Sequence, residues 1–348
     1  MTAFDINDLV RENVKRLKPY SSARDEYVSD GSKMIFLDAN ENPYETGLNR
    51  YPDPQQRSLK TLLAEQKQIL EQNILLGNGS DEVLDLIFRA FCEPNQDNII
   101  TLPPTYGMYK VLSGINAIEN REVFLTKNFE LDVPKILDAI DDKTKIIFIC
   151  SPNNPTGNTF QKEKVKQILE NFSGLVVIDE AYIDFSNSDS WLSALQEYPN
   201  LIVTQTMSKA YGMAGIRLGI CYASMEIIAV LNKIKPPYNI NQLTQYQALK
   251  RVLDDTMVQE EVTQILEERK KLIDKLKGIG FVQKIYPTDA NFVLVKVDDA
   301  NRRYEQLLQL NVVVRNRSNQ PLCENTLRFT IGTPEENQQL MALLNKIT

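Results

Sequence analysis

The chain has 348 residues, 43% of them hydrophobic, and a formal net charge of −7 with no histidine. A single core stops growing at roughly 250 to 300 residues, so we expect one large domain and a smaller second one. The negative charge argues against generic binding to nucleic acid or anionic membranes, and the lack of histidine excludes imidazole acid–base catalysis, histidine triads and histidine metal ligands.

The N-terminal segment MTAFDINDLVREN mixes charged and apolar residues, unlike the apolar run of a secretory signal. No stretch of the chain approaches the roughly 18 consecutive apolar residues of a membrane span. The four cysteines lie far apart and form no CxxC pair, so neither a disulfide framework nor a zinc site is predicted. We therefore expect a protein of the reduced cytoplasm without a metal site.

From about Ile74 to Ala223, short apolar runs alternate with amphipathic segments, one of which carries a helical stripe of Leu84, Ile87 and Phe91. Strands that alternate with helices predict an α/β fold, with a mostly parallel sheet covered by helices on both faces. In such sheets, ligands bind beyond the carboxyl ends of the strands. The predicted strands lie in NILLGNGS, NIITLPPTY, EVFLTK, KIIFICSPNNPTG, LVVIDEAY, LIVTQTMSK and RLGICYA.

The pattern changes after the prolines of KIKPPYNINQ. A long amphipathic helix is predicted to end at Gly278, strand-like NFVLVKV, VVVRN and LRFTIG follow, and Thr333 opens a last helix with a capping box. We expect residues 31–237 to form the large domain and residues 238–348 a smaller α+β domain. Residues 1–30 are predicted to be an arm that packs with the small domain or with a partner subunit.

Polar residues follow several of the predicted strands. GNGSDE opens a helix at Ser80 and Asp81, where free backbone N–H groups and the helix dipole form an anion site, although a capped glycine turn is the commoner meaning of such a string. SPNNPTG is a turn that holds Asn154 at the edge of the sheet. LVVID ends on Asp179, and a carboxylate in that place needs a cation or a donor, which a structural salt bridge would also supply.

The run LIVTQ leads to Lys209, and Arg217 follows. A lone lysine is usually a solvated surface charge. The strand ends together, however, supply a lysine, a carboxylate, an amide, the phenol of Tyr182, an anion site and an arginine. Pyridoxal 5′-phosphate (PLP) requires this set: a lysine for a Schiff base, a carboxylate for its pyridinium nitrogen, donors for its phenolate and a phosphate site. Their joint occurrence predicts a PLP site.

The motifs SPNNPTG, DEAY and SKAYGMAGIR are similar to those of the aspartate-aminotransferase superfamily of PLP-dependent enzymes. Within it, the chain resembles histidinol-phosphate aminotransferases nearly end to end, in LDANENPY, RYPD, GNGSDE, PPTYGMY and ANFVLV. The resemblance implies a homodimer with shared active sites that converts L-histidinol phosphate and 2-oxoglutarate to imidazole acetol phosphate and glutamate in histidine biosynthesis. Alternatives on the same fold are an aromatic aminotransferase and a threonine-phosphate decarboxylase. A PLP-sensing regulator would add a DNA-binding module, for which the chain has neither spare length nor a basic helix.

The resemblance also implies roles for individual residues around the cofactor. Lys209 would bond PLP covalently and, once released, shuttle a proton at the substrate carbon. Asp179 would pair with the pyridinium nitrogen. Asn154 and Tyr182 would bond the phenolic oxygen, and Tyr106 would stack on the ring.

Further roles concern the two anions. Tyr51 would reach the cofactor phosphate from a second subunit, and Tyr20 would add a hydroxyl at the substrate. Arg315 and Arg328 would bind the substrate carboxylate or phosphate, because a planar guanidinium suits both, although surface arginines are more often structural. The residues implied at the cofactor phosphate from the same subunit are Ser80 and Asp81, through backbone N–H groups, with Thr206, Ser208 and Arg217.

Overall fold

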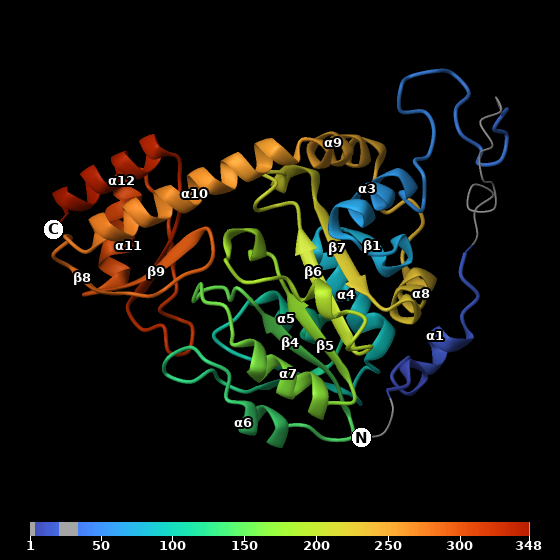
Figure 1. Cartoon of the computed structure of the whole chain (residues 1–348), viewed down its shortest axis with the longest axis horizontal. Coiled ribbons are helices and arrows are strands. Elements are labelled where there is room, and N and C mark those ends of the chain that lie inside the picture. The colour runs from blue at the N-terminus through green and yellow to red at the C-terminus, as the bar shows by residue number, and fades with distance from the viewer. Residues whose placement is uncertain (1–3, 21–33, 348) are drawn as a thin grey trace.

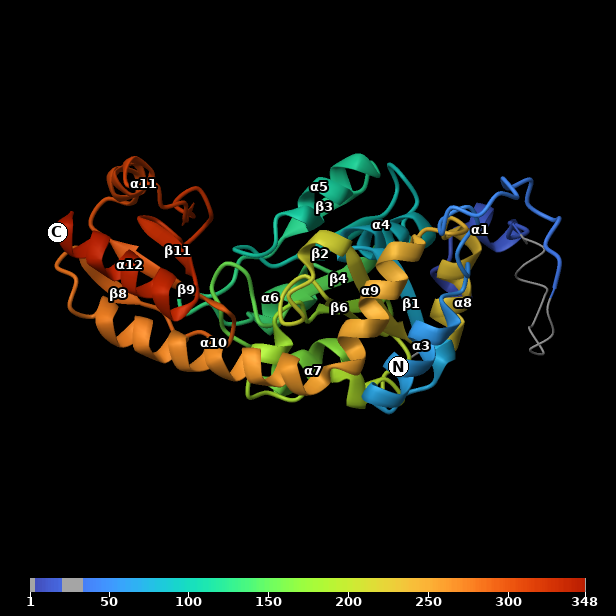
Figure 2. The same ribbon diagram turned by 90° about the horizontal axis from the view of Figure 1, so that it is seen from above.

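The computed structural model describes residues 4–20 and 34–347. Within these ranges the chain builds a large body around a seven-stranded sheet, of order β1-β7-β6-β5-β4-β2-β3, and a smaller body around a four-stranded sheet, of order β10-β11-β9-β8. Figures 1 and 2 show the small body, which contains the C-terminus, at one end of the molecule, joined to the large body through the long helix α10 (Asp255–Leu276). The predicted α/β fold with a second, smaller α+β unit is confirmed.

The large body holds most of the secondary structure. Its strands are β1 (Ile74–Asn78), β2 (Asn98–Thr101), β3 (Glu119–Glu122), β4 (Thr144–Cys150), β5 (Leu175–Asp179), β6 (Leu201–Thr206) and β7 (Leu218–Ala223). Its α-helices are α3 (Arg57–Lys67), α4 (Ser80–Phe91), α5 (Met108–Ile115), α6 (Val133–Asp138), α7 (Lys162–Asn171), α8 (Met225–Ile234) and α9 (Gln242–Leu253). Short 3-10 turns are η2 (Glu71–Asn73), η3 (Ile183–Phe185), η4 (Trp191–Ala194) and η5 (Ala214–Ile216).

The large sheet is mostly parallel and buried on both faces. Strands β3, β2, β4, β5 and β6 pair in parallel, whereas β7 runs antiparallel to both β6 and β1. Successive residues of β4 enter different cores: Ile147 packs with residues of α3, α7 and α9, and Phe148 packs with residues of α4, α5 and α8. Helices therefore cover both faces, which agrees with the continuous burial of the central strands β5, β6 and β7.

Two strands differ from the prediction. Strand β3 is the polar segment ENRE and ends at Glu122, so most of EVFLTK lies beyond it. In VVVRN the ladder contains Arg315 and Asn316, while the valines before them precede strand β10 (Arg315–Asn316). Edge position explains both cases, because β3 and β10 each pair on one side and their lengths follow the neighbouring strand rather than the apolar run.

The small body packs its sheet against three helices. Its remaining strands are β8 (Val282–Ile285), β9 (Phe292–Val297) and β11 (Thr326–Thr330), and its helices are the end of α10, α11 (Ala300–Gln309) and α12 (Pro334–Lys346). The capping box predicted at Thr333 is present, since its hydroxyl accepts from the backbone of Glu336 and the Glu336 carboxylate accepts from the backbone of Thr333.

Within its own chain, the described part of the N-terminal arm contacts the large body. After η1 (Ile6–Asp8), helix α1 (Glu12–Arg16) contacts α8, and Val14 is buried with residues of α4 and α8. The Arg11 guanidinium lies 3.1 Å from the Glu93 carboxylate. Residues 1–3 and 21–30 of the predicted arm lie outside the described residues.

The two bodies share helix α10. Val258 and Val262, near its start, belong to the core of the large body, whereas Leu272 and Leu276, near its end, belong to the core of the small body. Helix α9 packs on α3 of the large body. We therefore propose that the division falls within α10 rather than at residue 238. No helix in the described ranges is both long enough and apolar enough to cross a membrane.

Candidate active site

A pocket lies at the carboxyl edge of the large sheet, where strands β4, β5 and β6 end and α4 begins. It brings together residues that are far apart in sequence. The predicted site residues among those that line it are Ser80, Asp81, Tyr106, Asn154, Asp179, Tyr182, Thr206, Ser208, Lys209 and Arg217.

Strand direction explains this gathering. Parallel strands β5 and β6 end on Asp179 and Thr206, which places the residues after them at the same edge. Strand β7 is antiparallel to β6 and begins at this edge, so Arg217, which immediately precedes it, arrives there as well. Because β7 runs opposite to β6, the start of β7 lies at the same edge as the end of β6, and Arg217 reaches the site.

Asp179 is 3% exposed and accepts two hydrogen bonds from neutral donors. The Tyr109 hydroxyl donates to its Oδ2 at 2.7 Å, and the Ala181 N–H donates to its Oδ1 at 3.2 Å. Burial raises the pKa of this carboxyl. Among the described residues, no lysine or arginine forms a salt bridge with Asp179, so a buried carboxylate here still lacks a cation.

Sequence reasoning did not find Tyr109. Its ring is fully buried and stacked on Phe148 at 4.8 Å, and its hydroxyl reaches Asp179. It is the last residue of the motif PPTYGMY and lies in the first turn of α5. The available signal was that a buried tyrosine needs a hydrogen-bond partner for its hydroxyl.

Lys209 lies at the centre of the pocket. Burial, and then the neighbouring Arg328 guanidinium, lower the pKa of its amine, and Asp179 opposes them only in part. The amine is 5.5 Å from the centre of the Tyr182 ring. A lysine with a lowered pKa holds more of its neutral, nucleophilic form at neutral pH.

An anion cradle forms where β1 turns into α4. Gly79 has φ +80°, and a Cβ built there would lie 2.7 Å from Nη2 of Arg217. A Cβ at Gly219 would lie 2.2 Å from the backbone nitrogen of Ser80. Both glycines let strand β7 and the Arg217 guanidinium approach the first turn of α4, where backbone N–H groups are unpaired.

Side chains complete the cradle. Arg217 donates to the Ser208 hydroxyl at 3.4 Å, and the Ser208 N–H donates to the Thr206 hydroxyl at 3.1 Å. Asp81 was expected to act only through its backbone, but its carboxylate lies 3.7 Å from Arg217 and accepts a 3.0 Å hydrogen bond from the Tyr106 hydroxyl. Asp81 therefore also orients the cation and the aromatic ring beside it.

The small sheet presents a row of three arginines toward this pocket. Arg315 lies opposite Arg328 in the ladder, and the Arg317 N–H donates to the carbonyl of Thr326, so alternation places all three arginines on one face. The same face carries Phe292, which packs with the core of the large body and lies 4.9 Å from the Arg328 guanidinium carbon.

The arginine row has no carboxylate partner among the described residues. Arg328 donates to the Asn154 side-chain oxygen, and the Nε atoms of Arg317 and Arg328 are buried without an acceptor. Burial, and then Arg328 and Arg315, lower the pKa of Arg317 to about 10. Arg317 was not predicted from the sequence. Its spacing of two residues from Arg315 was the available signal, because residues two apart in a strand lie on the same face.

Two predicted residues lie outside the pocket of their own chain. Tyr51 is half-exposed and stacks on Tyr238, with ring centres 4.5 Å apart, in a separate surface pocket. Tyr20 is 72% exposed and follows α1, which Figures 1 and 2 place at the opposite end of the molecule from the small body. A single chain therefore does not bring either hydroxyl to Lys209.

Known proteins match the chain over its length. The family model for aminotransferase class I and II matches residues 33–344. A protein of Flavobacterium johnsoniae named histidinol-phosphate aminotransferase is 65% identical over 338 residues, 97% of each chain, and one of Christiangramia forsetii with the same name is 63% identical over 347 residues, covering 100% of this chain and 99% of that one. The crystal structure of the histidinol-phosphate aminotransferase from Clostridium acetobutylicum has a TM-score of 0.80 at 28% identity, covering 86% of this chain and 91% of that one.

Proposed function

The chain belongs to the class I and II aminotransferase family. We propose that it transfers the amino group of L-histidinol phosphate to 2-oxoglutarate, giving imidazole acetol phosphate and L-glutamate. Full-length relatives more than 60% identical bear the name of this activity. The observation that carries the substrate class is the row of Arg315, Arg317 and Arg328, which lacks carboxylate partners among the described residues and faces the Lys209 pocket.

The pocket fits PLP as its cofactor. Asp179 is a buried carboxylate without a described cation, which suits a protonated ring nitrogen. The first turn of α4, Ser208 and Arg217 offer donors at one end, which suit a phosphate. Lys209 supplies an amine with a lowered pKa between these two groups. When bound, PLP supplies an electron-withdrawing ring that takes up the amino group and weakens the adjacent carbon–hydrogen bond.

The residues of this chain would hold the cofactor and move the proton. Asp179 holds a proton at the ring nitrogen, and Tyr109 and Ala181 keep the carboxylate in place by donating to it. Asn154 and Tyr182 orient the ring through its phenolic oxygen, and Tyr106 covers one face. Lys209 Nζ accepts the proton that the amino donor loses from carbon, because its lowered pKa leaves the amine free to act as a base.

The arginine row would bind the second anion. Histidinol phosphate presents a phosphate where glutamate presents a carboxylate, so the same site must accept both. Arg328 lies deepest, next to Asn154, and Arg315 is exposed at the rim. Arg317, two residues beyond Arg315 on the same face, adds a third cation, which suits a dianionic phosphate better than a single guanidinium does.

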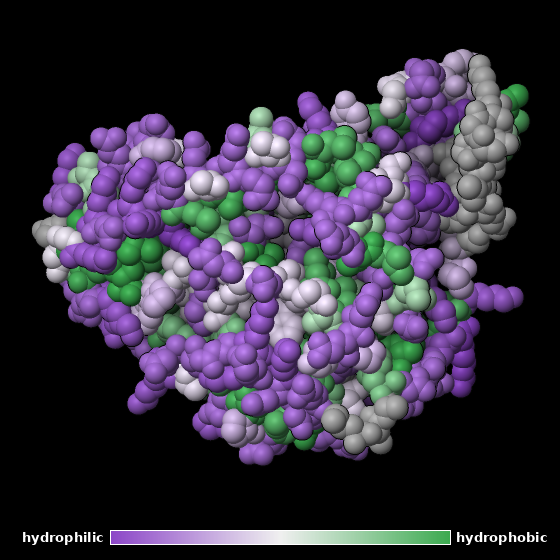
Figure 3. Space-filling model, in the orientation of Figure 1, coloured by the Kyte–Doolittle hydropathy of each residue, from purple (hydrophilic) through white to green (hydrophobic). Residues whose placement is uncertain are grey.

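We also propose a homodimer in which Tyr51 reaches the partner's cofactor phosphate and Tyr20 reaches the partner's substrate. The segment before Tyr51 exposes Ile35 and Leu37, which are 84% and 88% exposed, and it stands away from the body in Figures 1 and 2. Figure 3 shows apolar side chains gathered at the surface over α9 and the start of α10, where Leu253 is 72% exposed. Exposed apolar surface of this extent supports an interface between subunits.

A reducing compartment such as the cytoplasm agrees with the cysteines. Cys92, Cys150, Cys221 and Cys323 are all buried and unpaired.

The test compares amino donors in single half-reactions. PLP-loaded enzyme is mixed separately with L-histidinol phosphate, phenylalanine and threonine phosphate, and the change of cofactor absorbance gives kcat/KM for each. We expect the value for histidinol phosphate to exceed the others by at least tenfold. A larger value for phenylalanine would reassign the enzyme to aromatic amino acids, and release of CO2 from threonine phosphate would reassign it to decarboxylation.

A further inference from the structure

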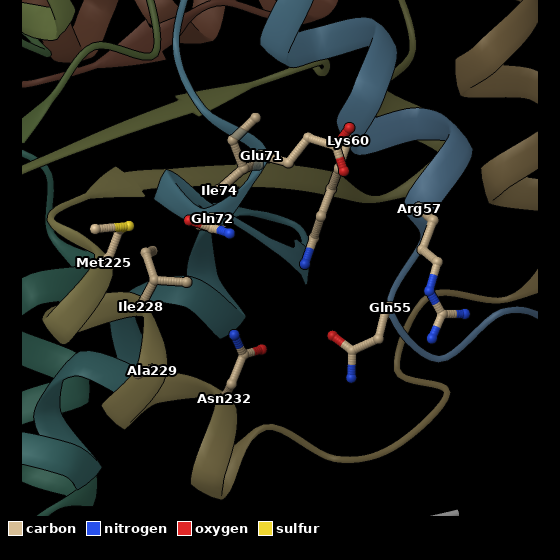
Figure 4. Close-up of a pocket in the computed structure, with 10 residues that line it drawn as sticks. All are labelled: Gln55, Arg57, Lys60, Glu71, Gln72, Ile74, Met225, Ile228, Ala229 and Asn232. Carbon is tan, nitrogen blue, oxygen red and sulfur yellow. The ribbon is translucent and has the colours of Figure 1, made fainter. Parts of the chain in front are cut away.

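A second polar cavity lies in the large body, apart from the Lys209 pocket. It has a volume of about 400 Å³ and is bounded by the start of α3, by η2 and by α8. Figure 4 shows its polar side chains, with Lys60 entering from α3, Gln55 from the loop before α3, and Asn232 from α8. Neither the proposed cofactor nor the proposed substrate uses any of these residues.

Lys60 is the unusual member of this cavity. Lys60 is only 7% exposed, and its ammonium group points into the open space of the cavity (Figure 4). In the described part of the chain, the Lys60 ammonium forms no hydrogen bond and no salt bridge, whereas its backbone N–H donates to the carbonyl of Gln56. A buried ammonium without an acceptor is costly, so an acceptor from outside the chain would be bound favourably.

The charged neighbours of Lys60 do not neutralise it. Asp53 lies 2.8 Å from the Arg57 guanidinium and is paired with it. Glu71 accepts a hydrogen bond of 2.8 Å from the Thr61 hydroxyl. Lys235 adds a second positive charge nearby and donates to the carbonyl of Pro54. The field in the cavity is therefore positive around the Lys60 amine.

Asn232 provides a second unsatisfied group. Its side-chain oxygen is buried and has no hydrogen-bond partner among the described residues. Figure 4 shows its amide pointing toward the same space as the Lys60 ammonium and the Gln55 amide. A side-chain amide can turn by half a rotation to present its NH2 group, so Asn232 can serve a ligand either as an acceptor or as a donor.

We propose that this cavity is a binding site for a small oxyanion, a phosphate or carboxylate group, which Lys60 neutralises and the amide of Asn232 orients. The positive charge of Lys60 excludes a metal cation, and the Lys60 ammonium and the Asn232 amide, which face the same space in Figure 4, exclude a purely apolar ligand. The apolar part of the wall, with Ile74, Met225 and Ile228, leaves room for the carbon skeleton of an organic anion.

The experiment measures anion binding to PLP-loaded enzyme by calorimetry in a buffer of low anion content. Inorganic phosphate is the first probe, and we expect two classes of site in the wild-type enzyme. Lys60→Met should lose one class, with Kd at least tenfold weaker, while its half-reaction with histidinol phosphate stays unchanged. Arg328→Ala should lose the other class and retain the one at Lys60. Identical isotherms for wild type and Lys60→Met, or loss of all phosphate binding in Arg328→Ala, would overturn the proposal.

Two further variants separate binding from structure. Asn232→Asp places a carboxylate of the same size opposite Lys60, so it should abolish anion binding without altering the fold. Lys67→Met removes a lysine from the same helix outside the cavity and should bind phosphate as the wild type does. If Asn232→Asp binds phosphate with wild-type affinity, the assigned site is wrong.

Acetate, as a second probe, distinguishes the sources of the anion. Binding of phosphate without acetate assigns a phosphoryl ligand, and binding of acetate at the Lys60 site assigns a carboxylate. Failure of both to bind there would refute the site.

Discussion

Replacing Lys60 with methionine should make the protein more stable in a buffer without binding anions. Burial, and then the nearby Lys235 ammonium, lower the pKa of Lys60 from 10.5 to about 8. This pKa difference of about 2.5 corresponds to a free energy of about 3 kcal/mol, because one pKa unit equals about 1.36 kcal/mol. This is the cost of keeping Lys60 charged in the folded state below pH 8, and methionine of similar length avoids it. We expect Lys60→Met to raise the free energy of unfolding by about 1 to 3 kcal/mol at pH 7.

The pH dependence follows from the sign of the shift. Between pH 8 and pH 10.5 the unfolded chain holds the Lys60 proton while the folded chain releases it, so wild-type stability rises with pH in this window. The advantage of Lys60→Met should therefore shrink from pH 7 to pH 10. Below pH 8 the full cost is present, and the advantage should be constant.

Urea unfolding measures both effects. It can be followed by the fluorescence of Trp191, the single tryptophan, which is 7% exposed. The enzyme is PLP-loaded and kept at one concentration, because the stability of the proposed dimer would depend on concentration. Lys67→Met controls for loss of a lysine from the same helix. A Lys60→Met protein less stable than wild type at pH 7, or an advantage that is unchanged at pH 10, would show that Lys60 is paired or neutral and would refute the reasoning.

Three other substitutions test the proposed active site. Lys209→Ala should abolish transamination yet still bind PLP noncovalently, as dialysis and absorbance would show; retained turnover would remove the central assignment. Asp179→Asn should fold and bind PLP but slow the half-reaction by several powers of ten, because the ring nitrogen loses the carboxylate that keeps it protonated; a normal rate would leave Asp179 as a structural group. Arg317→Gln should lower kcat/KM for histidinol phosphate by about ten- to a hundredfold, the value of one charge-assisted bond, while cofactor absorbance is unchanged. Arg302→Ala, on the outer helix α11, is its control, and an equal loss in both variants would contradict a role for Arg317 in substrate binding.

Much of the large sheet could be predicted because its strands are apolar runs that end in polar residues. Asp179 and Lys209 follow strands that lie side by side, and parallel direction alone places both at one edge. Arg217 was expected at the same edge, but its position there depends on β7 running opposite to β6. Apolar periodicity does not reveal strand direction.

The remaining errors arise from contacts between different elements of the fold. EVFLTK has the composition of a strand, but hydrogen bonding to β2 selects the polar segment before it. Tyr109 is buried because of its ring, and only the fold shows that its hydroxyl reaches Asp179. Arg317 is placed beside Arg315 by a short ladder that the preceding valines obscured. In each case the contact joins segments far apart in sequence, which composition and spacing do not encode.

Helix α10 also determines how the two bodies can move. It has 22 residues, so it is a stiff rod about 33 Å long, anchored in one core at Val258 and in the other at Leu276. The bodies meet again at Asp289, whose N–H donates to the carbonyl of Gly157 at 2.7 Å and whose carboxylate accepts from Thr159. The small body is held at further points, since Arg328 donates to Asn154 and Phe292 packs with the core of the large body. A rotation of the small body would move the arginine row relative to Lys209. An anion bound by both bodies would oppose that rotation.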